Sequence, residues 1–167
     1  MRSLALVCLV VLAGCFGAAP ATDTPATTPE PLQLNVTNGA STSYTFTVGV
    51  VNRSVGRVRL TFENGSTRTV DVPVDGIARV YGYENLTDAV PVAGQEVVRT
   101  YQLAPGSGAR AGIAPPPVDG AVFLTARNVD GTVEHWAVAT CDRGERLRAV
   151  DFFLTQQGVG AGVGCRP

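Results

Sequence analysis

Residues 32–52 read LQLNVTNGASTSYTFTVGVVN, and this stretch decides the fold class of the chain. Two runs within it alternate between apolar and polar side chains, and the apolar positions are Leu32, Leu34, Val36, Tyr44, Phe46, Val48 and Val50. A period of two places one face of a β-strand in the core and the other in water. The stretch therefore predicts two neighbouring strands, each buried on one side.

Strand signals continue along the chain, whereas helix signals are almost missing. Further runs with strand character are residues 57–62, 70–74, 77–83, 97–103, 121–127, 133–140 and 147–154. Three dipeptides that supply the positive φ of tight hairpins lie between runs: Asn64-Gly65, Asp75-Gly76 and Asp130-Gly131. About nine short strands at this spacing predict an all-β fold, namely an antiparallel β-sandwich of immunoglobulin-like architecture.

Residues 33–52 also resemble the opening strands of many extracellular immunoglobulin-like modules. The Cys…Trp…Cys pattern of true immunoglobulin domains is absent, so the resemblance implies an architecture and not a family. Two stretches are expected to lack strands: residues 104–117 (APGSGARAGIAPPP), a predicted surface loop, and the glycine-rich tail 158–164. Pro73 cannot donate a ladder hydrogen bond, which predicts an edge strand or a kink there.

Residues 1–14 have the pattern of a secretory signal peptide. One basic residue, Arg2, precedes an apolar run at residues 4–12 that is too short to span a bilayer. Small residues follow this run and stand directly before a cysteine. The tetrapeptide Leu12-Ala13-Gly14-Cys15 resembles the lipobox of prokaryotic lipoproteins.

This resemblance implies cleavage between Gly14 and Cys15 and a lipid thioether on the Cys15 sulfur. The partner of Cys15 would then be membrane lipid, and the protein would be anchored in the cell membrane facing outside. The alternative is an ordinary signal peptide cut near Ala19 or Ala21, which would release a free secreted protein.

Residues 15–31 are dominated by threonine, proline and alanine, with almost nothing to bury. This composition predicts a disordered linker with a bias toward extended polyproline II. The linker would carry residues 32–167, which fit one domain that is large enough to bury a core. All thirteen basic residues are arginine, and together with the lipobox and the linker this resembles a haloarchaeal surface lipoprotein. An actinobacterial lipoprotein is the competing interpretation.

The charge balance speaks against nucleic acid as a partner. Removal of Arg2 with the signal peptide leaves 12 of the 13 arginines against 14 acidic residues, a net charge of −2. Nucleic-acid binding requires a basic face, which this composition does not predict.

Four asparagines stand in N-x-Ser/Thr sequons, and these N-glycosylation candidates are Asn35, Asn52, Asn64 and Asn85. The alternative for each is ordinary turn chemistry with the local backbone. Cys141 and Cys165 are the two cysteines that remain after Cys8 leaves and Cys15 is lipidated. An oxidising compartment predicts a disulfide between them, and the alternatives are a metal pair or a redox couple.

No catalytic set is recognisable in the sequence. His135 is the only histidine, and it lies in a predicted strand beside Trp136, so the two side chains are expected to face opposite ways. The sequence lacks a G-x-S-x-G elbow, a lysine-containing phosphate loop and the two histidines of a blue-copper site. Acids that could meet around Ca²⁺ are Asp119, Asp130, Glu134, Asp142, Glu145 and Asp151, although they also suit a solvated surface. No metal and no cofactor are predicted.

These features predict a lipid-anchored surface protein that is not an enzyme and binds an envelope protein or an extracellular ligand. One alternative is an accessory subunit of a membrane transporter or an envelope enzyme complex. Another is a secreted enzyme that uses dispersed carboxylates, and it would require two carboxylates that converge on a pocket.

Overall fold

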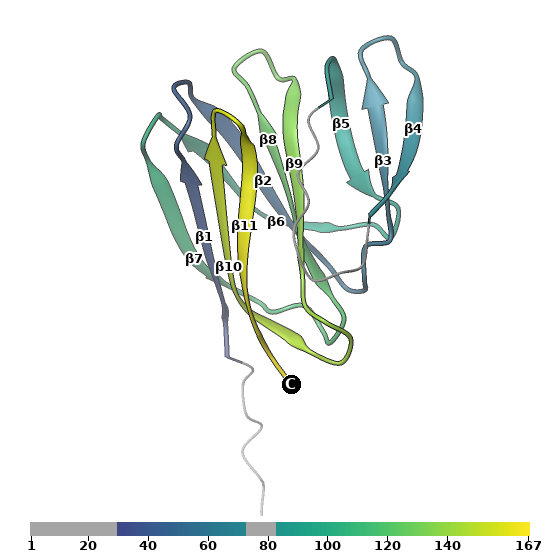
Figure 1. Cartoon of the computed structure of the whole chain (residues 1–167), viewed down its shortest axis with the longest axis vertical. Coiled ribbons are helices and arrows are strands. Elements are labelled where there is room, and N and C mark those ends of the chain that lie inside the picture. The colour runs from purple at the N-terminus through teal and green to yellow at the C-terminus, as the bar shows by residue number, and fades with distance from the viewer. Residues whose placement is uncertain (1–29, 73–82) are drawn as a thin grey trace, which may run out of the picture.

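The computed structural model describes residues 30–72 and 83–167, and these residues form eleven β-strands and no helix (Figure 1). The strands are β1 (Leu32–Asn38), β2 (Tyr44–Val51), β3 (Arg57–Phe62), β4 (Thr67–Asp71), β5 (Leu86–Pro91), β6 (Glu96–Leu103), β7 (Gly108–Ile113), β8 (Ala121–Arg127), β9 (Val133–Thr140), β10 (Arg146–Thr155) and β11 (Gly158–Arg166). The all-β prediction is confirmed, and the strands are organised as packed sheets.

The strands form three sheets. Sheet A has the order β11-β10-β1-β7, sheet B has the order β6-β2-β8-β9, and sheet C has the order β4-β3-β5. Every pair is antiparallel except β1 and β10, which run in parallel, so the prediction of a purely antiparallel sandwich was wrong there. A parallel pair needs a long connection, and here β2 to β9 all lie between the two partners.

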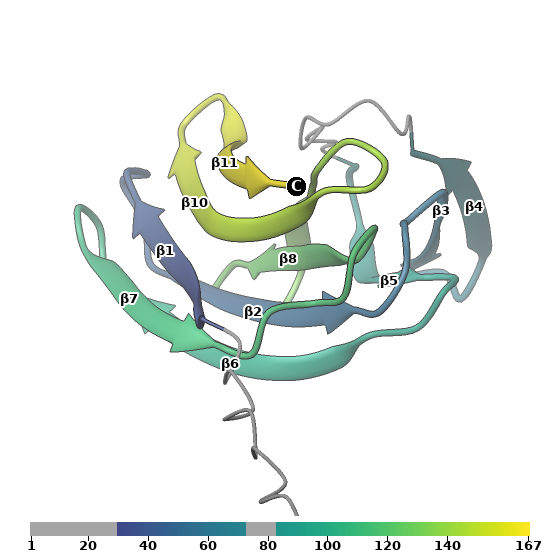
Figure 2. The same ribbon diagram turned by 90° about the horizontal axis from the view of Figure 1, so that it is seen from below.

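Sheet B is the middle layer of the molecule. One apolar cluster joins sheet A to sheet B through residues such as Phe152 and Leu124, while a second joins sheet B to sheet C through Phe123 and Trp136. Strand β8 is therefore buried on both faces, and its sequence AVFLTAR reads as a continuous apolar run. Figure 2 shows β3 and β4 on the opposite side of β2 and β8 from β1 and β7. Sheet C was not anticipated as a separate layer.

Two stretches that were expected to lack strands pair in sheet A instead. Residues 108–113 within the predicted loop form β7, which pairs with β1 and places Ala109 and Ala111 against the core. The glycine-rich tail forms β11, which pairs with β10 along its length. Its Gly160 lies under the ring of Phe153, since a Cβ there would come within 2.2 Å of the ring.

The hairpin turns agree with the sequence where they are described. Gly65 and Gly131 have φ values of 77° and 85°, so each supplies the left-handed residue that its turn requires. The predicted turn at Asp75-Gly76, the Pro73 position and most of the predicted strand 77–83 lie outside the described residues. Strand β5 was not predicted, because its sequence LTDAVP lacks a clear alternation.

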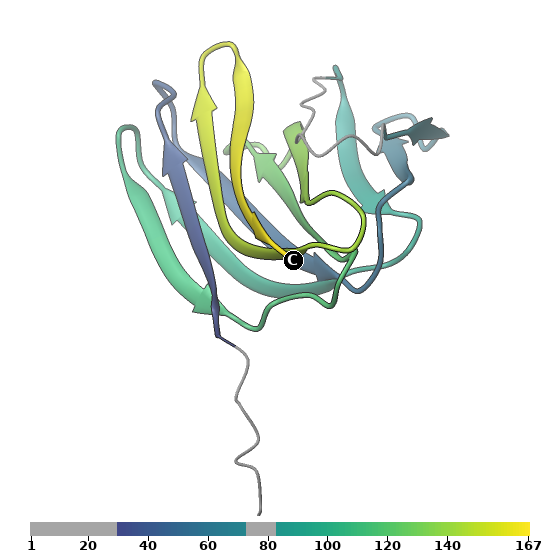
Figure 3. The ribbon, with the colours of Figure 1, turned by 60° about the horizontal axis from the view of Figure 1, so that its bottom comes forward.

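The strands run between two ends of the molecule, which we call the near end and the far end. The near end contains Glu30, the start of β1 and the C-terminus (Figure 3). There, Arg148 donates to the Glu30 carboxylate at 2.5 Å, and Arg166 lies 3.6 Å from the same oxygen. The far end contains the turns at residues 39–43, 63–66, 104–107, 128–132 and 156–157.

Candidate functional site

The far end of the molecule carries a cavity of about 490 Å³, which we call the far-end pocket. Three turns and the ends of β2, β6 and β8 form its wall. The lining residues are Ser43, Tyr44, Thr45, Gln102, Leu103, Ala104, Arg127, Asn128, Val129 and Gly131. Its volume falls within the range of small-molecule sites, which is about 300–1,000 Å³.

Two asparagines fix the turns around the far-end pocket. Asn38 is fully buried, and its amide donates to the carbonyls of Thr42 and Leu103, at 2.9 Å each. This side chain therefore ties the β1–β2 turn to the end of β6. The side-chain oxygen of Asn128 accepts from the backbone N–H groups of Asp130 and Thr132 at 3.0 Å each, which closes the β8–β9 turn. The pocket walls are thus held by internal hydrogen bonds.

A polar network lies at the wall of the pocket. The Tyr44 hydroxyl donates to one carboxylate oxygen of Glu134, and the Asn128 amide donates to the other at 2.9 Å. Burial raises the pKa of Tyr44 above its usual value of 10.0, and the hydrogen bond to Glu134 acts in the same direction. Tyr44 is therefore a protonated donor at neutral pH, and both oxygens of Glu134 are already occupied.

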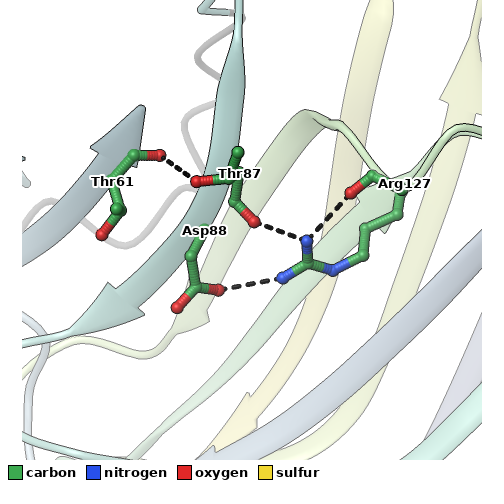
Figure 4. Close-up of polar contacts among 5 residues, drawn as sticks. Thr61, Thr87, Asp88 and Arg127 are labelled. Atoms are coloured by element: carbon green, nitrogen blue, oxygen red, sulfur yellow. Dashed lines mark hydrogen bonds and ion pairs between the residues drawn. The ribbon is translucent and has the colours of Figure 1, made fainter. Parts of the chain in front are cut away.

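Arg127 joins sheet B to sheet C beside the same pocket (Figure 4). Its guanidinium donates to the Asp88 carboxylate at 2.9 Å, to the Thr87 carbonyl at 2.6 Å and to the Gly131 carbonyl at 3.1 Å. The Thr87 hydroxyl in turn donates to the carbonyl of Thr61 at 3.0 Å within sheet C. The positive charge that borders the pocket is thus paired with a carboxylate.

A second cavity, of about 430 Å³, brings two carboxylates near the only histidine. Its lining residues are Tyr83, Glu84, Asn85, Thr132, Glu134 and His135. Glu84 and Glu134 therefore border one pocket, which is the arrangement that the carboxylate-enzyme alternative requires. Glu134, however, keeps both oxygens in the hydrogen bonds to Tyr44 and Asn128.

His135 and Trp136 face opposite sides of β9, as the sequence predicted. Trp136 is fully buried and stacks on Phe123 with ring centroids 5.8 Å apart, whereas His135 is half-buried. The His135 Nδ1 atom is buried without a hydrogen-bond partner in the part of the chain that the structure describes. Burial lowers the pKa of His135 below 6.5, and the nearby Glu134 carboxylate opposes this effect.

This placement predicts an acid-sensitive contribution of His135 to stability. A lowered pKa means that the unfolded chain binds a proton which the folded protein resists, so stability falls as the pH drops below about 6.5. For one proton the slope cannot exceed about 1.4 kcal/mol per pH unit, and we expect clearly less because the ring is partly solvated. Urea unfolding between pH 7.5 and 5.5 should show a shallower acid loss for His135→Gln than for the parent protein. Equal slopes would contradict the prediction.

The four sequon asparagines lie in different surroundings. Asn52, Asn64 and Asn85 are exposed in turns, whereas Asn35 is half-buried in the middle of β1. The Asn64 side-chain oxygen accepts from the Ser66 N–H at 2.9 Å, so local turn chemistry is present at this sequon. Asn85 has a φ of 60°, a conformation that asparagine tolerates better than most residues.

The two late cysteines form a disulfide, and Cys15 lies outside the described residues. Cys141 and Cys165 are bonded with their Cα atoms 5.9 Å apart, which links the end of β9 to the end of β11. Together with Glu145 they are the only close group of three potential metal ligands within residues 30–72 and 83–167. Because both sulfurs are bonded to each other, the group lacks the thiolates that a metal would need.

The six acids considered for calcium do not come together. Asp119 lies in the turn after β7, and its carboxylate accepts from the Gly144 N–H at 2.8 Å at the near end. Asp130 and Glu134 lie at the far end, and Asp151 lies on β10. The calcium alternative is therefore not supported by the described residues.

The sequence did not identify the residues that build the far-end pocket. Asn38, Tyr44 and Arg127 read as ordinary strand residues, and their role depends on contacts with distant parts of the chain. A usable signal was Asn128, which stands four residues before Thr132 across a predicted Asp-Gly turn. An asparagine at such a place often caps the turn through its side chain.

None of the described residues forms a helix of the length and hydrophobicity that a membrane crossing requires. No protein-family model, curated protein or solved structure matches this chain at a significant level.

Proposed function

We propose that this protein is a lipid-anchored, non-catalytic binding module on the outer surface of the cell. The observation that carries the proposal is the placement of the near and far ends. Glu30, which directs the chain toward Cys15, is held at the near end, whereas the far-end pocket is built from turns at the opposite end. An anchor at Cys15 would therefore present the pocket away from the membrane.

The linker composition gives this arrangement its reach. Residues 15–31 are rich in proline, and an extended polyproline II chain rises about 3.1 Å per residue, so they could span about 50 Å. The binding turns would then stand clear of the lipid headgroups. N-glycans on exposed sequons such as Asn52 and Asn64 would be compatible with this extracellular location.

The anchor is tested by Cys15→Ser with Cys8→Ser as the matched control. We expect Cys15→Ser to shift the protein from the membrane fraction to the soluble or secreted fraction, because the lipid attachment site is gone. Cys8 lies within the signal peptide, so Cys8→Ser should leave the membrane fraction unchanged. The measurement is membrane fractionation, followed by intact mass of the mature amino terminus.

A membrane-bound Cys15→Ser protein would contradict the proposal. So would native material that retains Met1 or begins at an unmodified residue further along the chain. Either result would favour an uncleaved or ordinary signal peptide, such as one cut near Ala19 or Ala21.

The cavity between Glu84, Glu134 and His135 favours a second candidate, an enzyme that uses carboxylates. We prefer the binding module because Glu134 is held by Tyr44 and Asn128, so it is poorly placed to exchange a proton with a substrate. An accessory subunit of a membrane complex remains a third candidate. Purification from membranes with a stoichiometric partner would favour that third candidate over a module that acts alone.

A further inference from the structure

The far-end pocket offers hydrogen-bonding groups that the protein itself does not use. The side chains of Ser43, Thr45 and Gln102 line the pocket and have no hydrogen-bond partner within residues 30–72 and 83–167. Two hydroxyls and an amide can each donate and accept, so they suit a ligand whose own groups do both. The apolar side chains of Leu103 and Val129 provide nonpolar surface in the same wall.

The charged groups at the pocket are already compensated. Arg127 donates to Asp88 and to two backbone carbonyls, so an anionic ligand would have to compete with a bound carboxylate. Glu134 accepts from Tyr44 and Asn128, so it offers little to a cationic ligand. The groups that remain to recognise a ligand are neutral.

The pocket is also held in shape before any ligand arrives. Asn38 and Asn128 fix two of the turns that form it, and Gly106 donates to the Asn38 carbonyl at 2.7 Å to fix the third. A ligand would therefore meet little cost in ordering these turns. Preorganised neutral hydrogen-bonding groups beside apolar surface match a ligand with many hydroxyls on an otherwise nonpolar ring.

We propose that the far-end pocket binds a neutral carbohydrate, such as the end of an uncharged surface glycan. This inference rests on the proposed function and names the chemical class of its ligand. Ser43, Thr45 and Gln102 hydrogen-bond to sugar hydroxyls, while Tyr44 and Leu103 contact the nonpolar faces of the sugar ring.

The test is a titration of the isotope-labelled full-length protein with glucose, galactose, mannose, N-acetylglucosamine, maltose and cellobiose, followed by amide NMR. The detergent must lack a sugar headgroup, because such a headgroup would compete for the pocket. We expect at least one of these neutral sugars to give saturable shifts at residues 43–45, 102–104 and 128–131. The absence of saturable shifts for the whole panel up to 50 mM, or shifts centred elsewhere, would overturn the proposal.

Variants connect the binding to the pocket. Ser43→Ala and Gln102→Ala should each raise the Kd of the bound sugar roughly three- to tenfold, and the double variant more than tenfold. Gln33→Ala is the matched control, because Gln33 is exposed on β1 outside the pocket, and it should leave the Kd unchanged. Unchanged binding in the double variant would refute the assignment of the pocket.

Charged sugars test the neutrality of the site. Glucuronic acid and glucosamine should bind at least tenfold more weakly than glucose or its best neutral relative, and equal binding would overturn this part of the proposal. The outcome is separable from the anchor, which depends on Cys15→Ser alone. A released Cys15→Ser protein combined with no sugar binding would reject only the carbohydrate inference, whereas sugar binding by a membrane-bound Cys15→Ser protein would reject only the anchor.

Discussion

Replacing Cys141 and Cys165 together by serine is expected to lower the free energy of unfolding by about 3.5 kcal/mol. The bond closes a loop between residues that are 24 positions apart, and this loop contains β10 and most of β11. Without the bond, the unfolded chain gains the conformational freedom that the closed loop had removed. The disulfide also secures an edge strand whose glycines contribute few side-chain contacts of their own.

Urea unfolding of the double variant against the parent protein measures this effect. The reduced parent protein is the control, and it should unfold at nearly the same urea concentration as the double variant. Amide hydrogen exchange should accelerate most in β11, because that strand loses its covalent link to the end of β9. A loss below about 1 kcal/mol would mean that pairing with β10 holds β11 in place without the bond.

Strands β8 and β9 show how far the sequence could determine the fold. Their predicted bounds, 121–127 and 133–140, agree with the structure, because apolar side chains and an Asp-Gly turn mark both strands locally. Strands β7 and β11 carry no such signal. Their glycines and alanines have little side chain to bury, so their conformation is decided by the partners β1 and β10, which are distant in sequence.

The same limit applies to the candidate site. Tyr44 and Glu134 meet because β2 and β9 flank β8 in sheet B, and no local pattern reports that order. Arg127 reaches Asp88 only because sheet C packs against sheet B. By contrast, the Cys141–Cys165 pairing followed from simple counting, since only two cysteines remained in an oxidising compartment.

Trp136→Ala is expected to lower the free energy of unfolding by roughly 3–5 kcal/mol. Trp136 is the largest fully buried side chain, and it stacks on Phe123 at an interplanar angle of 26°. Both rings belong to the cluster that holds sheet C against sheet B, together with Val58, Leu60 and Leu86. Loss of the indole leaves a cavity in the interface between two sheets, and neighbouring strands cannot close it without moving their own ladders.

Calorimetry or far-ultraviolet circular dichroism should record this loss, because Trp136 is the only tryptophan and its fluorescence disappears with the substitution. Val129→Ala is the control, since Val129 is 79% exposed at the tip of the β8–β9 turn and should change stability by less than about 0.5 kcal/mol. Amide exchange should rise in β3 and β5 before it rises in β1 and β10, because the cavity lies on the sheet C side of β9. A uniform rise in all three sheets would instead indicate that sheet C unfolds only together with the rest of the molecule.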